Sequence, residues 1–306
     1  MLVWLLLPLG LLVVAEIACR AYGLHTPVRY EATPYGYRVK PNQDIRRFGN
    51  RVFYNAQGLR SEPAEPMPSA GVERVLCIGD SVTFGGTQTD QQDTYPYQLQ
   101  GALRRRGLSA EVLNASAGGW ALENEEGWLR ANGVLGSRFV VVQVGTHDLF
   151  QHQAPPETVG SHPSFPDRAP LVGLQELVFR YLVPRILGEV QTEDPRAPIA
   201  PPSKADVGRS LSTLGRIVDL AQSAGARAIV LLVEQPRDIE PADALSQFAK
   251  AELLSFVQTR KLELVRPGDA IEARGGRILF RDDVHPNAGG NGVIADALAD
   301  AILASR

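Results

Sequence analysis

The chain has 306 residues, 44% of them hydrophobic and 21% charged, and its formal net charge is −3. This length and apolar content can bury one large core, so one globular domain is expected. The slightly acidic balance offers no electrostatic basis for nucleic-acid binding. The two cysteines, Cys19 in an apolar N-terminal stretch and Cys77 in a predicted buried strand, indicate neither a disulfide between them nor a cysteine–histidine zinc site.

An apolar stretch runs from Leu2 to Ala15 and continues over residues 17–19 after the single Glu16. In a helix, about eighteen residues rise roughly 27 Å, just enough to cross a thin bilayer. The favoured interpretation is an uncleaved transmembrane signal anchor over residues 1–22. A cleaved signal peptide, a lipid-modified Cys19 and a buried core helix are the alternatives.

The orientation of such an anchor is predicted by its flanking charges. Basic residues follow the apolar stretch and none precedes it, which by the positive-inside rule would place the following domain in the cytoplasm. Residues 23–70 are rich in proline, glycine, tyrosine and arginine and predict an extended lead-in, with a short strand and turn at 52–60. The globular domain is expected over residues 71–306.

Strands and helices alternate within this domain. Apolar runs predict five strands, and amphipathic or capped stretches predict the helices between them. The strands are expected at 74–79, 111–115, 138–145, 226–233 and 262–265, and the helices at 94–106, 122–132, 208–223, 242–259 and 292–305. Such alternation is typical of an α/β fold with a parallel sheet and helices on both faces.

A proline-rich insert interrupts the alternation at about residues 150–206, and its centre contains a helical patch at 171–187. A loop this long in a compact domain is usually functional or disordered. Because it follows the third strand, the insert is expected to hang over the strand ends. It is interpreted as a partial lid, with a mobile or membrane-facing flap as the alternative.

Four polar or glycine-rich segments fall where the carboxyl ends of parallel strands meet, which is where ligands bind in open α/β sheets. They are Gly79-Asp80-Ser81, the Asn114–Gly119 loop, Gly145-Thr146-His147-Asp148 and the Asp282–Asn287 loop.

The first and last segments together predict a nucleophile with its base. Ser81 would stand at a helix N-terminus, but a serine hydroxyl needs a base, and that base needs an orienting group. Asp282 lies three residues before His285, a spacing that can place its carboxylate against Nδ1 and leave Nε2 for Ser81. Asp283 is interpreted as a solvated loop charge. Asp80 is expected to accept backbone N–H groups within its own turn.

An acyl-transfer mechanism also needs fixed donors that converge on the oxyanion. The Ser81 N–H is one candidate. A glycine N–H after the second strand is another, because a residue without a side chain lets the backbone approach closely, and Gly119 is preferred to Gly118. A side-chain donor after the third strand would complete the set.

In its four segments the chain resembles the SGNH, or GDSL-type, hydrolase family. Gly79-Asp80-Ser81, Gly119, Gly145-x-x-Asp148 and Asp282-x-x-His285 follow the family's order. The resemblance implies a three-layer α/β/α sandwich with a five-stranded flavodoxin-like sheet, and a serine esterase, lipase or acylhydrolase that needs no metal or other cofactor. The apolar start and the Asn-x-x-Gly-Leu-Arg turn are similar to bacterial membrane-anchored members. Such members commonly act on envelope glycans or lipids, which favours an extracytoplasmic domain despite the flanking charges.

One position departs from the family. The third segment is normally Gly-x-Asn-Asp, whose asparagine donates to the oxyanion, and here His147 stands in its place. A neutral imidazole has one N–H, so we hypothesise that His147 is the donor and that a neighbour such as Asp148 sets its tautomer. A weakened oxyanion hole is the rival hypothesis.

The sequence therefore predicts a hydrolase that removes an O-acyl group, in the first place acetyl, from an envelope glycan or lipid ester. Transfer of the acyl group to a sugar hydroxyl is a second enzymatic interpretation. A non-catalytic glycan-binding module on the same fold is the alternative from another class.

Overall fold

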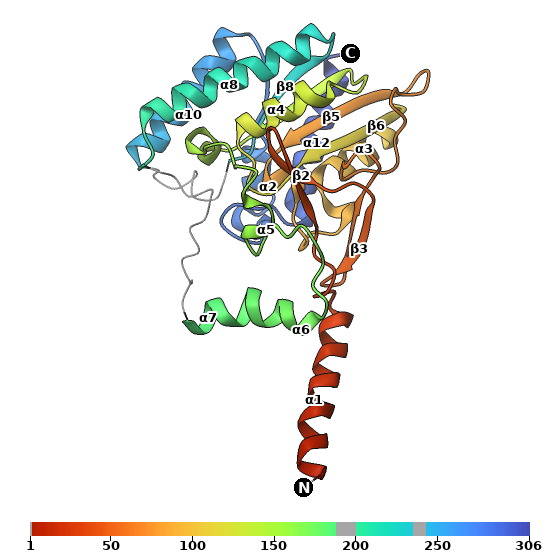
Figure 1. Cartoon of the computed structure of the whole chain (residues 1–306). Coiled ribbons are helices and arrows are strands. Elements are labelled where there is room, and N and C mark those ends of the chain that lie inside the picture. Colours follow the sequence, from red (N-terminus) through yellow and green to blue (C-terminus); the bar gives the residue numbers. More distant parts are fainter. Residues whose placement is uncertain (1, 188–199, 235–242) are drawn as a thin grey trace.

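A five-stranded parallel sheet lies at the centre of the computed structural model, which describes residues 2–187, 200–234 and 243–306 (Figure 1). Its strand order is β6-β5-β7-β8-β9, and every neighbouring pair is parallel. The strands are β5 (Glu73–Gly79), β6 (Ala110–Ser116), β7 (Phe139–Val144), β8 (Arg227–Leu232) and β9 (Glu263–Val265). This is the flavodoxin-like order, so the predicted sheet is confirmed.

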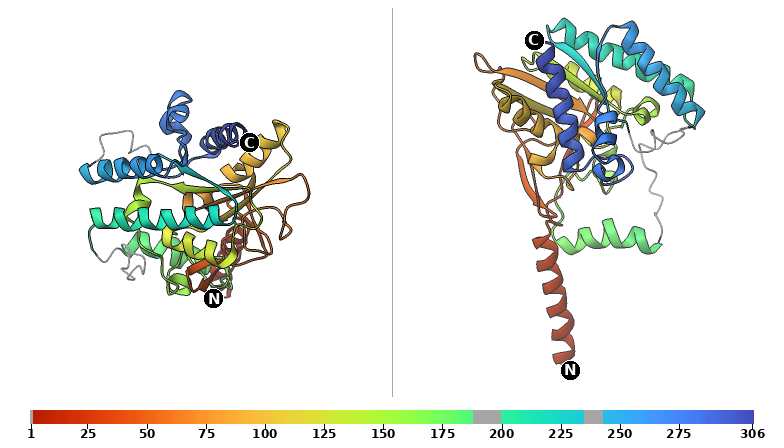
Figure 2. Two further views of the ribbon diagram at one scale, coloured as in Figure 1. Left: turned by 90° about the horizontal axis from the view of Figure 1, so that it is seen from above. Right: turned by 180° about the vertical axis from the view of Figure 1, so that it is seen from behind.

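Helices cover both faces of the sheet and make an α/β sandwich (Figure 2). Every residue of β7 is buried, as expected for a central strand covered on both sides. One face packs on α3 (Tyr95–Arg105), α11 (Gly268–Ala273) and α12 (Ala288–Ala304), and the other on α4 (Leu122–Asn132), α8 (Lys204–Ser223) and α10 (Ala244–Thr259).

Several of these helices begin at side chains that accept backbone N–H groups. Ser203 caps α8 in a capping box with Asp206, and Asp243 accepts two N–H groups at the start of α10. Asn287 does the same for α12, at Gly289 and Gly290. Because Asn287 is the N-cap of α12, the loop that ends at this residue is held against the start of the helix.

Two antiparallel hairpins precede the sheet. They are formed by β1 (Tyr30–Thr33) with β2 (Gly36–Val39), and by β3 (Gln43–Arg47) with β4 (Asn50–Tyr54). The strand expected near residue 52 is thus β4, which pairs with β3. Tyr37, Val52 and Tyr54 are fully buried, so the hairpins extend the core.

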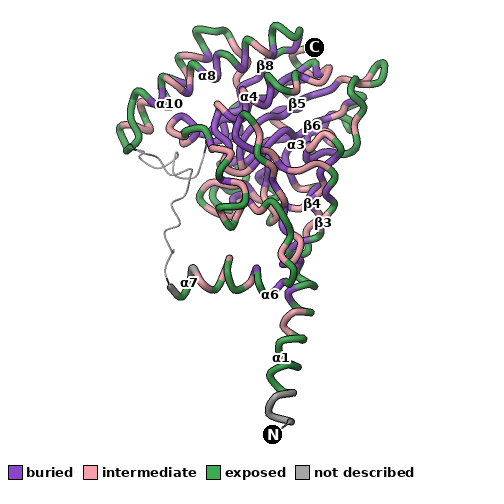
Figure 3. The backbone as a smooth tube through the Cα atoms, in the orientation of Figure 1, coloured by how far each residue is buried: buried purple, intermediate pink, exposed green. Residues whose placement is uncertain are grey.

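Helix α1 (Leu2–Ala21) projects from the domain, and its residues 7–14 are exposed (Figure 3). Among the residues that the structure describes, no helix has the length and apolar character needed to cross a bilayer, so the predicted transmembrane helix finds no support. The insert after β7 carries α5 (Thr158–Ser161) and a longer helical segment made of α6 (Gly173–Glu176), the π-helical η3 (Leu177–Leu182) and α7 (Val183–Leu187).

Candidate active site

The turn after β5 places Ser81 at the carboxyl edge of the sheet. Asp80 caps the short helix α2 (Ser81–Phe84), and its Oδ1 accepts the Val82 N–H at 2.8 Å, as the sequence predicted. Gly79 must be a glycine here, because a Cβ would lie 2.2 Å from Thr83 Oγ1. The turn therefore brings the Ser81 hydroxyl past the end of a buried strand with little freedom in its backbone.

Ser81, His285 and Asp282 form one hydrogen-bonded chain. The Nε2 atom of His285 lies 2.9 Å from Ser81 Oγ. On the other side of the ring, Nδ1 lies 2.9 Å from both carboxylate oxygens of Asp282. The neighbouring Asp283 is 79% exposed and pairs with Arg277 at 2.7 Å, as expected for a solvated loop charge. The structure thus brings together the three side chains that the first and last segments offered.

Asp282 is held in its ionised form by donors of its own loop. Burial raises its pKa, but the backbone N–H groups of His285 and Val284 and the His285 ring outweigh this effect, and the pKa falls to about 2. The two N–H groups donate to Asp282 Oδ1 at 2.7 and 2.9 Å. A carboxylate fixed in this way orients the His285 ring and can stabilise positive charge on it.

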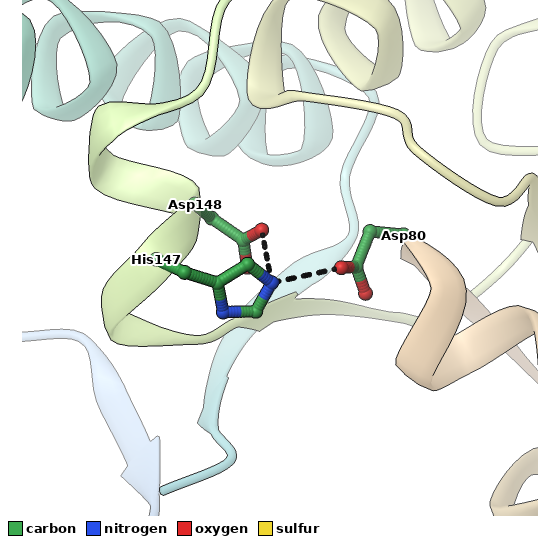
Figure 4. Close-up of side chains that lie close together, drawn as sticks. All are labelled: Asp80, His147 and Asp148. Atoms are coloured by element: carbon green, nitrogen blue, oxygen red, sulfur yellow. Dashed lines mark hydrogen bonds and ion pairs between the residues drawn. The ribbon is translucent and has the colours of Figure 1, made fainter. Parts of the chain in front are cut away.

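The third segment lies on the other side of Asp80 (Figure 4). His147 belongs to η2 (Thr146–Phe150), which follows β7 directly. Its Nε2 atom lies 3.2 Å from Asp80 Oδ2 and 3.2 Å from Asp148 Oδ1. Asp80 Oδ2 in turn lies 3.4 Å from Ser81 Oγ. His147 therefore reaches Ser81 through Asp80, and its Nε2 atom lies between two carboxylates.

The buried carboxyl groups around His147 have opposite pKa shifts. Burial raises the pKa of Asp80, but the His147 hydrogen bond and charge and the Val82 N–H outweigh it, so the pKa falls below its usual value. Burial and the charge of Asp80 raise the pKa of Asp148 to about 7, although His147 and the Gly145 N–H oppose them. Burial also raises the pKa of Glu125 well above its usual value. Negative charge therefore resides mainly on Asp80, beside Ser81.

Asp80, His147 and Asp148 also present ligand atoms that lie within 4.8 Å of one another, a set that could hold a metal ion. The contact of His147 Nε2 with Asp80 already accounts for part of this closeness, and a metal bound at Nε2 would have to replace that contact. We therefore interpret the group as a hydrogen-bonded cluster, and the expectation of a metal-free site stays a prediction.

A cavity of about 430 Å³ lies over the Ser81–His285 pair. Gly118, after β6, lines it, and Gly119 follows with a φ of 74° in the left-handed region that favours glycine. The Gly118 carbonyl accepts the Tyr37 hydroxyl at 2.7 Å, which ties this loop to the first hairpin. The preference for the Gly119 N–H as an oxyanion donor stays a prediction.

Comparison with known proteins decides the family. The GDSL-like lipase/acylhydrolase family matches residues 77–293, a span that begins in β5 and ends in α12. The chain belongs to this family. It is a carboxylic-ester hydrolase, as the sequence motifs predicted.

Solved structures with the same fold are distant in sequence from this acylhydrolase. An α/β hydrolase enzyme, LAE5, from the metagenome of Lake Arreo is 15% identical with a TM-score of 0.50, over 78% of this chain and 97% of that one. A mutant of Axe2, an acetyl-xylooligosaccharide esterase from Geobacillus stearothermophilus, is 15% identical with a TM-score of 0.49, over 78% and 96%. A G-D-S-L family lipolytic protein from Veillonella parvula is 14% identical with a TM-score of 0.47, over 74% and 97%. No curated protein matched.

Sequence reasoning missed the arginines around the acylhydrolase's cavity. Arg47, Arg180 and Arg281 line it together with Ser81 and His285. They come from β3, from the insert and from the loop before α12, so no local sequence pattern could predict that they lie close together. Arg47 and Arg180 both pair with Glu176. Apolar side chains also line the cavity, so its wall is part polar and part apolar: Val28, Phe48, Phe84 and Phe165.

Arg60 has a different task beneath the cavity. It is 2% exposed and donates to the carbonyl oxygens of Phe84, Gly86 and Thr89, in the loop that follows α2. The sequence indicated only a turn at this position. The side chain is the buried support of the Ser81 loop, and the Asn-x-x-Gly-Leu-Arg turn was its only signal in the sequence.

Proposed function

We propose that Ser81, His285 and Asp282 are the catalytic triad of this acylhydrolase and remove an O-acyl group from an ester through an acyl-enzyme. The observation that carries the proposal is the 2.9 Å separation of Ser81 Oγ and His285 Nε2, which is within direct proton-transfer reach. The two contacts of Nδ1 with Asp282 support the orienting role of that carboxylate.

The reaction would proceed in two halves. His285 Nε2 takes the proton of Ser81 as Oγ attacks the ester carbonyl, and the imidazolium is stabilised by the ionised Asp282. The same proton then passes to the leaving alcohol oxygen as the ester C–O bond breaks. Water, activated by His285, attacks the acyl-enzyme, and the acid leaves as Ser81 regains its proton.

The oxyanion hole we propose consists of the Ser81 N–H, the Gly119 N–H and His147. The position of Ser81 at the start of α2 supports the first donor, because a helix N-terminus presents free N–H groups. His147 Nε2 faces Asp80 and Asp148 in this structure. To act as a donor, Nε2 would have to give up its contact with one of these carboxylates and bind the oxyanion when the tetrahedral intermediate forms.

The cavity wall supports a polar alcohol in the substrate. Pockets for hydrocarbon chains are lined mostly by apolar side chains. Here Arg281, Gln88 and Ser164 share the wall with apolar side chains such as Phe84 and Phe165, so the cavity offers polar partners as well as apolar surface. We therefore propose an ester of a carbohydrate or of a polar lipid headgroup, with acetyl as the first acyl group to test.

A fluorophosphonate probe tests the triad directly. The wild-type protein is expected to be labelled covalently at Ser81, whereas Ser81→Ala stays unlabelled. Asp283→Asn serves as the matched control, because Asp283 lies beside the triad loop but contacts Arg277, and it should be labelled like wild type. Equal labelling of Ser81→Ala and wild type would refute the assignment.

A panel of p-nitrophenyl esters then reports the acyl preference. We expect acetyl to be hydrolysed faster than long acyl chains, because a cavity of about 430 Å³ with a part-polar wall would hold part of a long hydrocarbon chain against polar groups. Faster hydrolysis of long-chain esters would contradict the polar-ester part of the proposal and leave the triad standing.

A further inference from the structure

Two helical segments meet at the base of the molecule. Helix α1 projects away from the domain, and the segment of residues 171–187, helical from Gly173, runs across its end (Figures 1 and 2). Figure 1 and the right-hand view of Figure 2 show the segment beside the end of α1 and well apart from helices α8 and α10. We call the exposed surfaces of α1 and of residues 171–187 the lower face.

The joint between the two helices is built from specific contacts. The Glu16 carboxylate of α1 accepts the N–H groups of Gly173 and Leu174 at 2.9 Å each, so it caps the N-terminus of α6. Arg20 donates to the Leu171 carbonyl at 3.1 Å. At Gly173 a Cβ would lie 2.7 Å from Cys19 Cβ, so a glycine is needed for the helices to approach this closely.

The inner side of the segment is tied to the domain by charge. Arg47 of β3 and Glu176 form an ion pair whose side chains are 1% and 6% exposed. Glu176 also pairs with Arg180 at 3.0 Å, and Arg47 donates to the Tyr181 hydroxyl at 3.0 Å. These contacts fix which side of the segment faces the domain.

The lower face is apolar on its free side. Leu171, Phe179 and Ile186 are 89%, 66% and 75% exposed, and Leu182 lies between the last two at helical spacing. On α1, exposed apolar side chains include Leu9, Leu11, Val14 and Ile17, each at least 58% exposed. Contiguous apolar surface of this kind marks an interaction site.

The charge around the lower face is opposite to that of the whole chain. Residues 16–48 and 160–187, which form the joint and its surroundings, carry nine lysines and arginines against five acidic residues. The whole chain carries a net charge of −3. Arg46 and Arg185 are exposed and form no ion pair within the described residues. An apolar surface flanked by cations is complementary to an anionic lipid surface.

We propose that the lower face docks on an anionic lipid bilayer, with the apolar surface of α1 in the lipid and residues 171–187 lying along the headgroups. The arrangement of the joint, with α1 projecting and the segment running across its end, supports this occupant over a second copy of the chain. A protruding helix and a flat amphipathic one suit a planar, fluid surface that can admit the first and support the second.

Docking would also set the position of the proposed catalytic cavity relative to the membrane. Arg180 and Tyr181 line the cavity that holds Ser81 and His285, and Phe179 lies next to them on the free side of the same turn. The cavity would then open close to the lipid headgroups, where membrane-borne or adjacent esters are found. This consequence rests on the proposed function, whereas the docking itself does not.

An environment-sensitive fluorophore tests the docking in the full-length chain. Phe179→Cys is labelled with a nitrobenzoxadiazole and mixed with vesicles of phosphatidylcholine and phosphatidylglycerol. The native Cys19 and Cys77 are buried, and the unsubstituted chain measures their residual labelling. We expect the emission to shift to the blue and to be quenched about twofold or more by nitroxide-bearing lipid. Met67→Cys is the matched control, 65% exposed on a loop before β5, and should stay unquenched.

The remaining outcomes overturn the proposal. If the protein floats with the vesicles but the fluorophore at 179 has the same emission and quenching as the one at 67, the segment does not lie on the lipid surface. If the protein does not float with the vesicles, docking is excluded altogether. A blue shift that grows with protein concentration without vesicles would show that a second copy covers the face. About fivefold more protein is expected to float with vesicles that contain phosphatidylglycerol than with phosphatidylcholine alone. Equal amounts of floating protein would refute the preference for an anionic surface. None of these readouts uses catalysis, so they are independent of the fluorophosphonate result.

Discussion

The imidazole Nε2 of His285 lies 2.9 Å from the hydroxyl oxygen of Ser81, although 204 positions separate the two residues in the chain. Ser81 follows the second strand of the sheet order, and His285 is held by the loop that caps α12. Strand order and helix capping together produce this contact, and the proposed chemistry depends on it.

Substitution of Asp282 by asparagine should lower kcat/KM for p-nitrophenyl acetate roughly a hundred- to ten-thousand-fold. An amide cannot stabilise the His285 imidazolium and favours the wrong tautomer. The neighbouring Asp283→Asn is the matched control, because that side chain is 79% exposed and pairs with Arg277. Similar losses in both variants would mean that loop charge, and not the Nδ1 contact, supports activity.

His147 separates two hypotheses about the third segment. If its ring donates to the oxyanion, His147→Ala should lower kcat about a hundredfold, and His147→Asn should recover most of that loss because an amide N–H can take the same place. Both variants also remove the partner of Asp80, so steady-state kinetics are compared with thermal unfolding. An alanine variant with wild-type kcat would exclude the donor role.

Asp148 should make stability depend on pH. Its folded-state pKa is raised to about 7 by burial, whereas an unfolded aspartate titrates at about 4. Between these values the folded state keeps a proton that the unfolded chain releases, so the free energy of unfolding falls as pH rises. Asp148→Asn should abolish a fall on the order of 3 kcal/mol over that window, as measured by urea unfolding at several pH values.

Asp206 provides a control of opposite sign for this experiment. Hydrogen bonds from Ser203 and Arg209 lower its pKa to about 2. Its stabilising contribution is therefore complete above the unfolded value of about 4 and is lost as pH falls toward 2. Asp206→Asn should differ from wild type by a constant amount between pH 4 and 7. A pH slope unchanged by Asp148→Asn would contradict the assigned pKa.

Arg60 is expected to support the Ser81 loop through its fork of donors. Lysine keeps the charge but cannot reach three carbonyl groups at once, so Arg60→Lys should lower the free energy of unfolding by about 2–4 kcal/mol. It should also slow fluorophosphonate labelling of Ser81, since the carbonyls of Phe84 and Gly86 lose their donor. Arg105→Lys, at an exposed site, is the matched control. A labelling rate unaffected by Arg60→Lys would separate the loop's stability from the reactivity of Ser81.

The strands, most of the helices and the residues at the turns of this acylhydrolase could be predicted from local sequence patterns. Apolar runs, glycine turns and capping residues act over a few positions, so β5, α4 and the Asp282–His285 pair could be predicted from local spacing. The transmembrane interpretation of residues 1–22 rested on the same kind of local count, and the structure does not support it.

The meeting of distant side chains depends on the tertiary structure. The buried Arg47–Glu176 pair, the donors of Arg60 and the contact of His147 with Asp80 join elements that are separated in the chain. Such contacts leave no periodicity in the sequence, because each depends on the order in which strands pair and on which side of a helix is buried. These contacts matter because the polar groups are buried and would be costly to leave unpaired, and that burial exists only after the chain has folded.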